Sequence, residues 1–304
     1  MKLVTVGTVA FDDIETPRGR AEMVIGGAAT YISRSASFFV ENQGIVSVIG
    51  GDFPEDELEE MRSLGINTDG IEIKKEEKSF FWAGRYHDNM NKRDTLITDL
   101  NVLANFEPKL PEAYRSAEYL MLGNLTPDIQ MDVLNQMHKR PKLVVLDTMN
   151  FWMDIALDGL VAVLKRIDVL TINDEEARQL SGEYSLVNAA AVIHKMGPKF
   201  LIIKKGEHGA LLFHEGLVFS FPALPIAEVM DPTGAGDTFA GGFIGFLAKT
   251  EDLSFENMKR AIVYASVLAS YCVEDFSLAK LKELTQSDIS KRVEDFKSLT
   301  QFSI

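Results

Sequence analysis

Short runs of apolar residues recur along the chain, separated by segments with the spacing of helices. Each run is rich in β-branched residues and is continuously apolar instead of alternating with polar positions. Strands covered on both faces have this pattern, and such strands belong to parallel sheets flanked by helices. The runs begin at Leu3, Gly44, Tyr119, Lys142, Val169 and Phe200. They predict an α/β fold with a Rossmann-like, doubly wound, mainly parallel sheet.

The segments between these runs have helical features. The segment that starts at Pro127 carries proline and aspartate in its first turn, a common way for a helix to begin. Its apolar residues fall on one face; these are Ile129, Val133, Leu134 and Met137. The most apolar stretch, 261–273, is shorter than the roughly 18 residues that span a bilayer. Its many small residues predict a buried helix.

Two segments interrupt the alternation of strand and helix, 14–24 and 79–103. In the second, FFWAGRYHD and RDTLITDLNVL flank DNMNK like the arms of a hairpin. Strands inserted between the first units of a parallel sheet do not easily join it. We therefore expect one domain of 304 residues with a small β-strand lid. A plain surface hairpin is the alternative, but exposing Phe80, Phe81 and Trp82 is costly, which favours a cover over a ligand or a partner subunit.

Charge and cysteine content narrow the classes of function. The 31 Lys and Arg against 45 Asp and Glu give a net charge of −14. This surface lacks the basic character that binds nucleic acid or anionic membranes, so neither partner is expected. One cysteine cannot form a disulfide framework or a cysteine zinc site, and MKLVTVG does not resemble a signal peptide. We expect a cytoplasmic protein.

The sharpest motif is DPTGAGDTFAGGF, residues 231–243. Gly234, Ala235 and Gly236 leave backbone amides unobstructed by side chains. The helix that begins here would bury one apolar face, formed by Phe239, Phe243, Phe246 and Leu247. Free amides at the positive end of a helix dipole form an anion site, which suits a phosphate group.

Asp237 lies in the first turn of that helix. A carboxylate at this position stabilises a helix N-terminus, which is the simplest interpretation. It also lies beside the anion site, where an acceptor hydroxyl would need to lose its proton. One residue could serve both purposes.

This stretch resembles DTxGAGDxFxxGF, the signature of the PfkB family of carbohydrate kinases, which have the ribokinase-like fold. The resemblance implies that Asp237 is the catalytic base, that 234–236 form the anion hole, and that ATP phosphorylates a hydroxymethyl group. Pro232 stands where threonine is commoner. The pair Gly26 and Gly27 is similar to the family's N-terminal double glycine, so the resemblance covers essentially the whole chain.

The segment NDEEA resembles the family's NxxE element, matched by Asn173 and Glu176. The resemblance implies that Asn173 lies near the nucleotide and that Glu176 positions Mg²⁺ through ordered water. The residues alone favour a charged helix start, because Asp174 and Glu175 interact equally well with the helix dipole. Asp147 resembles part of a DxN segment that lines the same cleft, and is a secondary candidate.

The segment 204–209 is similar to the family's TLGxxG turn, which implies nucleotide contacts at Lys204, Gly206 and Gly209. A lysine near the triphosphate would act as a point charge, and a solvated lysine beside a turn is an equal alternative. The family also borders adenine with a later helix, which implies a contact at Ala265. The small residues of that helix predict close packing on a glycine face, formed by Gly241, Gly242 and Gly245.

The main candidate to bind the acceptor is Asp12. It lies five residues after Gly7, where the ribokinase-like pattern has a substrate-binding aspartate. A carboxylate can accept hydrogen bonds from two hydroxyls. Asp13 is the alternative, since adjacent strand residues point to opposite faces. A tyrosine stands where ribokinase has asparagine, so ribose is not the expected acceptor. Further candidates for contact with a sugar, sugar phosphate or nucleoside are Gly26, Gly27, Tyr31, Trp82, Arg85 and Asn124.

The resemblance thus implies an ATP- and Mg²⁺-dependent kinase acting on a hydroxyl of a sugar or sugar-like acceptor. A nucleoside kinase of the same fold, or a catalytically silent regulatory protein, are the alternatives. Asp231 and Thr233 are candidates to border a K⁺ site, as in some ribokinase-like enzymes. The apolar lid also predicts a homodimer. GxGxxG, P-loop and HExxH motifs are absent from the sequence.

Overall fold

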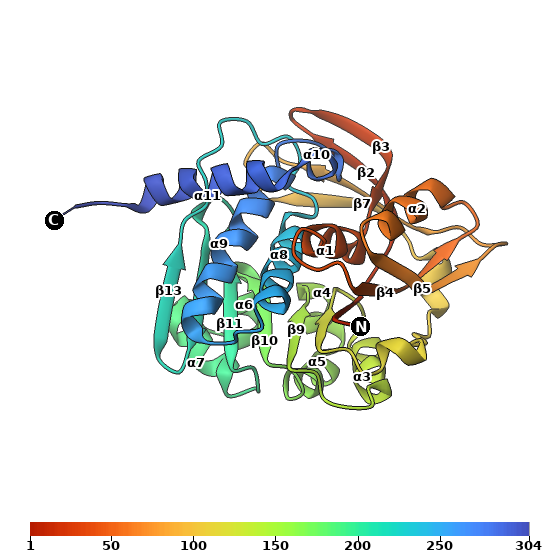
Figure 1. Cartoon of the computed structure of the whole chain (residues 1–304), viewed down its shortest axis with the longest axis horizontal. Coiled ribbons are helices and arrows are strands. Elements are labelled where there is room, and N and C mark those ends of the chain that lie inside the picture. The colour runs from red at the N-terminus through yellow and green to blue at the C-terminus, as the bar shows by residue number, and fades with distance from the viewer. Residues whose placement is uncertain (304) are drawn as a thin grey trace.

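The computed structural model describes residues 1–303 and has a nine-stranded sheet at its centre (Figure 1). The strands follow the spatial order β5 (Ile66–Lys74), β4 (Gln43–Gly50), β1 (Leu3–Val6), β8 (Tyr119–Leu122), β9 (Leu143–Asp147), β10 (Val169–Asn173), β11 (Phe200–Lys204), β12 (Ala210–His214) and β13 (Leu217–Phe221). All pairs from β5 to β11 are parallel, and β12 and β13 are antiparallel. The predicted fold class is confirmed, and the six predicted strands are neighbours.

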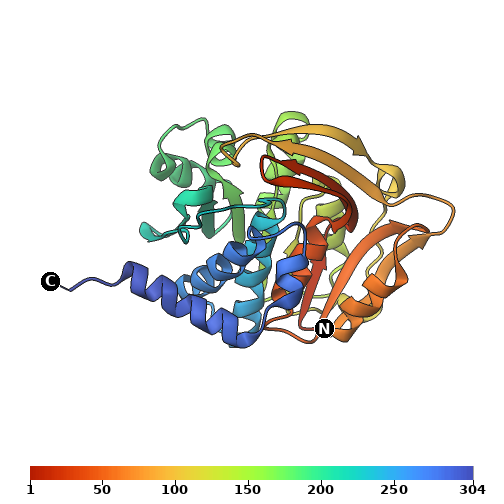
Figure 2. The same cartoon turned by 90° about the horizontal axis from the view of Figure 1, so that it is seen from above.

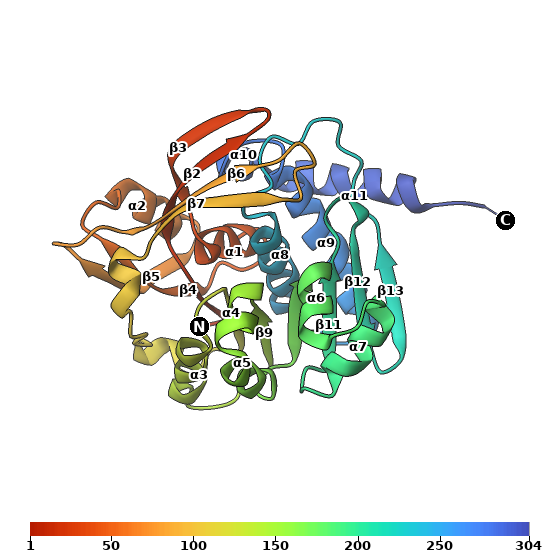
Figure 3. The ribbon, with the colours of Figure 1, turned by 180° about the vertical axis from the view of Figure 1, so that it is seen from behind.

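Helices cover both faces of this sheet. The face seen in Figure 1 carries α1 (Ala28–Ala36), α2 (Glu55–Ser63), α8 (Ala235–Thr250) and α9 (Phe255–Cys272), with α10 (Ala279–Glu283) and α11 (Gln286–Thr300) packed outside α9. The other face, seen in Figure 3, carries α3 (Pro127–Gln136), α4 (Asn150–Ile155), α5 (Leu157–Leu164), α6 (Asp174–Ser181) and α7 (Leu186–His194). Successive strand residues belong to the two cores in turn: Leu3 lies in the core that contains α8, and Val4 lies in the core that contains α3 and α5.

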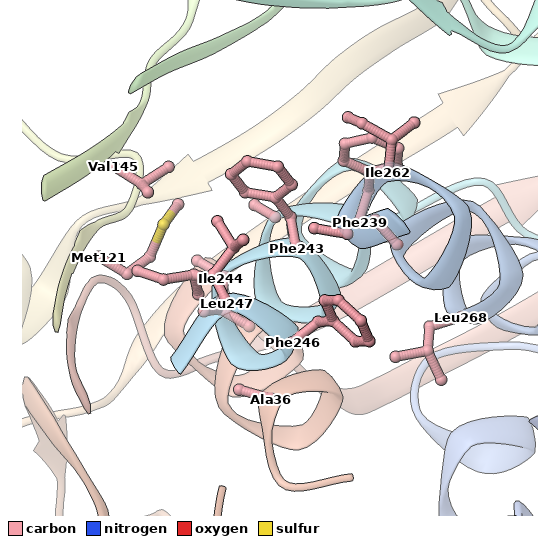
Figure 4. Close-up of a cluster of buried hydrophobic side chains, with 14 of the residues drawn as sticks. Ala36, Met121, Val145, Phe239, Phe243, Ile244, Phe246, Leu247, Ile262 and Leu268 are labelled. Carbon is pink, nitrogen blue, oxygen red and sulfur yellow. The ribbon is translucent and has the colours of Figure 1, made fainter. Parts of the chain in front are cut away.

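Helix α8 is held between α1 and α9 by small residues. Its four predicted apolar residues are all buried (Figure 4). A Cβ atom on Gly242 would lie 3.1 Å from Cα of Ala265, as the sequence predicts, but Gly241 and Gly245 face α1 instead. There, a Cβ on Gly241 would lie 2.2 Å from the carbonyl oxygen of Ile32. The three glycines therefore fix α8 against two helices.

A second sheet lies across one end of the molecule (Figure 2). This small sheet has the order β3 (Gly19–Gly26), β2 (Ala10–Thr16), β6 (Phe80–Tyr86) and β7 (Arg93–Asp99). The segment 79–103 forms the predicted hairpin, β6 and β7. The first strand begins at Ala10, earlier than the predicted start at Ile14, so Asp12 and Asp13 belong to the small sheet.

Within residues 1–303, no helix combines the length and the apolar character needed to cross a bilayer. The apolar stretch 261–273 falls almost entirely in α9, where Ala261, Ala265 and Leu268 are fully buried. The prediction of a buried helix is confirmed.

Candidate active site

The glycine loop turns sharply into α8. Gly234 caps the helix with φ +74°, a conformation that favours glycine. Its carbonyl accepts the first helical hydrogen bond, from Thr238 N at 2.7 Å. The amide of Ala235 donates to the Pro232 carbonyl at 3.2 Å, whereas those of Gly236 and Asp237 have no carbonyl partner within residues 1–303. These two amides are available for an anion.

Tyr31 lies directly beneath this loop. Its side chain is 1% exposed, and a Cβ atom on Gly234 would lie 2.4 Å from its ring. The ring is covered by the loop, and the expected contact between Tyr31 and an acceptor stays a prediction. The ring occupies the space that a side chain at position 234 would need, so Tyr31 and Gly234 together set the path of the loop.

Asp237 is partly exposed and accepts no hydrogen bond from any group in the described part of the chain. Burial, with a contribution from Asp147, raises the pKa of Asp237 to about 7, although Lys204 opposes the shift. A carboxylate with a free lone pair and a pKa near neutrality is suited to take a proton from a hydroxyl.

Lys204 ends β11 beside the anion loop. It forms an ion pair with Asp147, with Nζ at 3.1 and 3.2 Å from the two carboxylate oxygens. A Cβ atom on Gly236 would lie 3.1 Å from Nζ. Burial lowers the pKa of Lys204, but the nearby carboxylates, Asp147 first, raise it above its usual value. Lys204 is therefore a largely buried ammonium group next to the loop and not a solvated one.

Asn173 and Glu176 form a capping box at the start of α6. Glu176 N donates to Asn173 Oδ1 at 2.8 Å, and Asn173 N donates to Glu176 Oε2 at 2.8 Å. The pair therefore stabilises the helix start, which is the interpretation that the residues alone favour. Glu176 is buried, and this burial raises its pKa to about 7 despite the opposing charge of Lys204. Its second carboxylate oxygen is not used by the cap.

Asp12 projects from β2 on the other side of the anion loop. Its side chain is 5% exposed and has no hydrogen bond within residues 1–303. Burial, then repulsion from Asp231 and Asp237, raises the pKa of Asp12 to about 8. Asp13 points the opposite way, and its Oδ1 accepts a hydrogen bond from Met23 N at 2.7 Å. Of the two carboxylates, only Asp12 faces Asp237.

The double glycine supports Asp12 and α1 in different ways. A Cβ on Gly26 would lie 2.0 Å from Oδ2 of Asp12, so this glycine leaves room for the carboxylate. Gly27 adopts φ +91° as the N-cap of α1, and a Cβ there would lie 2.5 Å from the Thr8 carbonyl oxygen. Neither glycine contributes a side chain to a ligand, but both shape the acceptor side.

The small sheet brings Trp82, but not Arg85, towards the site. Trp82 lies opposite Asp12 in the parallel pairing of β2 and β6, so the two side chains share a face. Arg85 lies on the reverse face, in an ion pair with Glu15 at 2.9 Å. The expected acceptor contact of Arg85 is therefore wrong, because the alternation of β6 turns its side chain away.

Asn124 follows β8 by two residues, and its side chain is bonded within the chain. Its Oδ1 accepts a hydrogen bond from Trp152 Nε1 at 2.8 Å, and its Nδ2 donates to Met149 Sδ at 3.0 Å. The Asn124 amide is therefore already bonded to two side chains, and its contact with an acceptor stays a prediction. Trp152 was not among the residues singled out from the sequence.

The nucleotide-side candidates separate into two groups. Gly206 has φ +53° and lies in the short turn Gly206–His208, and Gly209 has φ +82° where a Cβ would lie 2.0 Å from the Phe221 carbonyl oxygen. Both shape the turn that follows Lys204. Ala265 is fully buried in the packing of α9 on α8. The expected contact of Ala265 with a nucleotide is wrong, because no surface of its side chain is exposed.

Asp231 ties the glycine loop to the loop after α9. Its Oδ1 accepts a hydrogen bond from Thr233 N at 2.8 Å and its Oδ2 one from Ser277 N at 3.1 Å. The Thr233 hydroxyl is bonded in turn to the hydroxyl of Tyr86, in the small sheet, at 3.1 Å. Sequence analysis missed Tyr86, although it lies four residues after Trp82 and alternation along β6 would have placed both on one face.

Comparison with known proteins identifies this arrangement. The chain matches the description "pfkB family carbohydrate kinase" over residues 2–283. The protein belongs to the pfkB family. It is similar to a cytidine kinase from Thermococcus kodakarensis, with 31% identity over 250 residues that cover 80% of this chain and 87% of the relative. As a pfkB-family kinase, it is a phosphotransferase with an alcohol group as acceptor.

Solved structures confirm the ribokinase-like fold of this pfkB-family kinase. A putative ribokinase II from E. coli in complex with ATP and Mg²⁺ has a TM-score of 0.79 and 18% identity, covering 98% of this chain and 99% of that one. A nucleoside kinase from Burkholderia thailandensis in complex with inosine has a TM-score of 0.76 and 18% identity, covering 97% and 99%.

The pfkB-family site fits a magnesium ion that is held mainly by phosphate and water. No group of three or more His, Cys, Asp or Glu side chains within residues 1–303 could hold a metal directly. Asp147 and the unused oxygen of Glu176 lie beside Lys204 and can accept hydrogen bonds from metal-bound water. Mg²⁺ retains much of its hydration shell when it meets phosphate oxygens, so these outer partners suit it.

Proposed function

We propose that this protein transfers the γ-phosphoryl group of ATP to the primary hydroxyl of a nucleoside. The observation that carries the proposal is the pair Asp12 and Asp237. Among the described residues, Asp12 is a nearly buried carboxylate with no hydrogen-bond donor, and Asp237 is a second carboxylate without one, beside the anion loop. A buried carboxylate without a donor is costly, and two sugar hydroxyls would supply the missing hydrogen bonds.

The proposed roles follow from this chemistry. Asp12 accepts hydrogen bonds from two acceptor hydroxyls and orients the sugar. Asp237 takes the proton of the attacking hydroxyl, and the amides of Gly236 and Asp237 stabilise charge on the transferring phosphoryl group. Lys204 binds a phosphate oxygen of ATP. Mg²⁺ bound to the phosphates would neutralise part of their charge, with Glu176 and Asp147 as partners of its water ligands.

The names of relatives favour a nucleoside over a free sugar as the acceptor. The cytidine kinase is similar over most of both chains, and the Burkholderia structure with inosine shares the fold. The aromatic groups at the acceptor side, Trp82 and Trp152, offer flat faces on which a base can stack. A free sugar is the second candidate, because the family as a whole is described as carbohydrate kinases.

An assay of ADP formation tests the proposal. The protein would be incubated with ATP and MgCl₂ and with separate nucleosides, pentoses, hexoses and sugar phosphates, with Asp237→Asn as the matched control. We expect ADP and a phosphorylated nucleoside from the wild type. Turnover of free sugars alone would select the second candidate. Binding of a nucleoside by calorimetry without ADP formation would instead support a silent regulatory protein.

We also propose that activity requires K⁺ and that the ion binds at the loop that contains Asp231. The carboxylate of Asp231 is fully buried and joins two loops next to the anion site, so a cation there would fix the loop geometry. Equal kcat in potassium and choline salts would refute this role.

A homodimer through the small sheet is the last part of the proposal. Strand β7 is an exposed edge strand, and Leu96 and Ile97 on it are 50% and 46% exposed. Edge strands with apolar side chains readily pair with a second chain. Light scattering at micromolar concentration should give twice the chain mass, and a monomer would contradict the proposal.

A further inference from the structure

Tyr86 joins the small sheet to the loop that precedes α8. It ends β6, its side chain is buried, and its hydroxyl forms the hydrogen bond of 3.1 Å with the hydroxyl of Thr233. In the described part of the chain, no other hydrogen bond connects residues 10–26 or 80–99 directly to residues 231–237. A single pair of hydroxyl groups therefore makes the direct polar contact between the two parts of the site.

A second, indirect link joins the same loop to β3. Asp231 accepts a hydrogen bond from Ser277 N at 3.1 Å, and the Ser277 hydroxyl donates to the carbonyl of Ile25. Ser277 has φ +56°, a left-handed conformation that is uncommon for serine. In the strand order of the small sheet, β2 lies between β3 and β6. Asp12 belongs to β2, so the two links reach the small sheet on either side of this aspartate.

One face of β6 connects Asp12 to Tyr86. Trp82 lies opposite Asp12 in the parallel pairing of β2 and β6. A Cβ atom on Gly84 would lie 2.0 Å from the Trp82 ring, so this ring lies over Gly84, on the side of the strand that leads to Tyr86. A ligand that packs against Asp12 and Trp82 would therefore contact the same strand face that ends in Tyr86.

The Tyr86 hydroxyl is suited to hold the loop and not to transfer a proton. Burial raises the pKa of Tyr86 above its usual value, so the phenol stays neutral near pH 7 and can donate or accept one hydrogen bond. Its partner Thr233 directly precedes Gly234, the residue that caps α8. A shift of Thr233 would therefore change the direction of the amides of Gly236 and Asp237, which follow in the first turn.

We propose that Tyr86 is a positioning residue, whose bond to Thr233 holds the anion loop and Asp237 in register with an acceptor bound to Asp12. This inference rests on the proposed kinase activity. Transfer requires the attacking oxygen to lie about 3–3.5 Å from phosphorus and in line with the leaving group. A small shift of the loop relative to the small sheet slows this step, although each substrate still binds to its own part of the site. Tyr86 therefore affects kcat more than the binding of either substrate.

The test compares Tyr86→Phe and Thr233→Val with Tyr114→Phe. Each of the first two variants removes one hydroxyl of the pair. Tyr114 is the matched control, because it is a buried tyrosine whose hydroxyl donates to the Asn67 carbonyl at 2.9 Å, on the edge strand β5. We expect kcat to fall about 10-fold in Tyr86→Phe and in Thr233→Val, from the lost hydrogen bond and the displaced loop. Tyr114→Phe should keep the wild-type kcat even if its Tm falls.

Three further measurements distinguish positioning from a general loss of structure. The double variant should lose no more kcat than either single variant, because both substitutions break the same bond. Thr233→Ser keeps the hydroxyl and should recover most of the kcat that Thr233→Val loses. The Kd values for ATP and acceptor, each measured alone, should change by less than about threefold in Tyr86→Phe.

The proposed role of Tyr86 can be refuted in three ways. The kcat of Tyr86→Phe could equal that of the wild type, the losses of the two single variants could multiply in the double variant, or weaker acceptor binding could account for the whole effect. Each of these results would overturn the role. A wild type that forms no ADP with any acceptor would refute the kinase proposal itself, before any variant is compared.

Discussion

Gly26 leaves the space that the carboxylate of Asp12 fills, since a Cβ atom on Gly26 would lie 2.0 Å from Oδ2 of Asp12. The two residues lie on the neighbouring strands β3 and β2. The backbone of Gly26 is not in the left-handed region, so alanine is excluded by the carboxylate and not by backbone strain. The acceptor side therefore depends on a missing side chain as much as on a charged one.

Gly26→Ala should accordingly raise the acceptor KM, because the new methyl group displaces the Asp12 carboxylate. We expect an increase of roughly 10-fold or more, comparable to loss of a charged hydrogen bond. Steady-state kinetics in the wild type and in an Asp12→Ala background measures the effect as a double-mutant cycle. If Gly26→Ala raises KM equally in both backgrounds, it does not act through Asp12.

Asp12→Ala should weaken acceptor binding by about 1.5–3 kcal/mol, or roughly 10- to 150-fold, and leave the Kd for ATP unchanged. Asp13→Ala is the matched comparison, because its carboxylate faces away and bonds to Met23 N. The measurement is the acceptor KM and the ATP Kd of both variants. An effect confined to Asp13→Ala would reverse the assignment of the two carboxylates.

Asp237→Asn keeps the shape of the side chain and removes the base. We expect kcat to fall by about 10²–10⁴-fold, while the Kd for ATP changes little. Stopped assays of ADP formation at saturating acceptor, with calorimetry for ATP, would measure both. Turnover near that of the wild type would show that another group takes the proton.

The activity should increase with pH across neutrality. Burial raises the pKa of Asp237 to about 7 and that of Asp12 to about 8, and both act as carboxylates in the proposed chemistry. Each is protonated and inactive below its pKa, so kcat/KM for the acceptor should rise until about pH 8. In Asp12→Asn, kcat/KM should rise only near pH 7. That rise is set by Asp237, which has Asp147 and Lys204 beside it. A profile that is flat from pH 6 to 9 would contradict this assignment.

Trp82 should report the binding of the acceptor. It shares a face with Asp12, and its Nε1 lies 3.4 Å from the Thr95 hydroxyl, so a ligand that packs against it changes its surroundings. The second tryptophan, Trp152, is bonded to Asn124, a predicted acceptor contact, so the titration uses a Trp152→Phe background. We expect a saturable change of fluorescence on addition of the acceptor. A constant signal at saturation would mean that the small sheet does not close on the ligand.

The fold could be predicted closely because its strongest elements are locally encoded. Continuous apolar runs identified six neighbouring strands, and glycines followed by phenylalanines identified α8. Strand β5 was missed because INTDGIEIK mixes polar and apolar residues, as suits a strand at the sheet edge. Strands β12 and β13 were missed, and six of their ten positions are exposed or partly exposed, unlike those of the strands at the centre of the sheet.

The site was only partly predictable, because side-chain direction depends on where a strand begins. Trp82 and Arg85 are both lid residues in the sequence, yet the pairing of β2 and β6 turns only Trp82 to the face of Asp12. Tyr31 and Ala265 lie at positions that the resemblance linked to ligands, but both are buried against glycines. Close packing of this kind depends on the distance between two helices or loops, which a motif does not encode.

The separation of the two sheets has a consequence for engineering. Asp12 and Trp82 belong to the small sheet, whereas Asp237 and the anion loop belong to the layer of α8. The small sheet is formed by only two stretches of chain, 10–26 and 80–99. A chimera that exchanges these two stretches with those of a relative would carry a new acceptor surface on an unchanged phosphotransfer centre. The natural splice points are Val9, Gly27, Ser79 and Leu100, where the chain enters or leaves the small sheet.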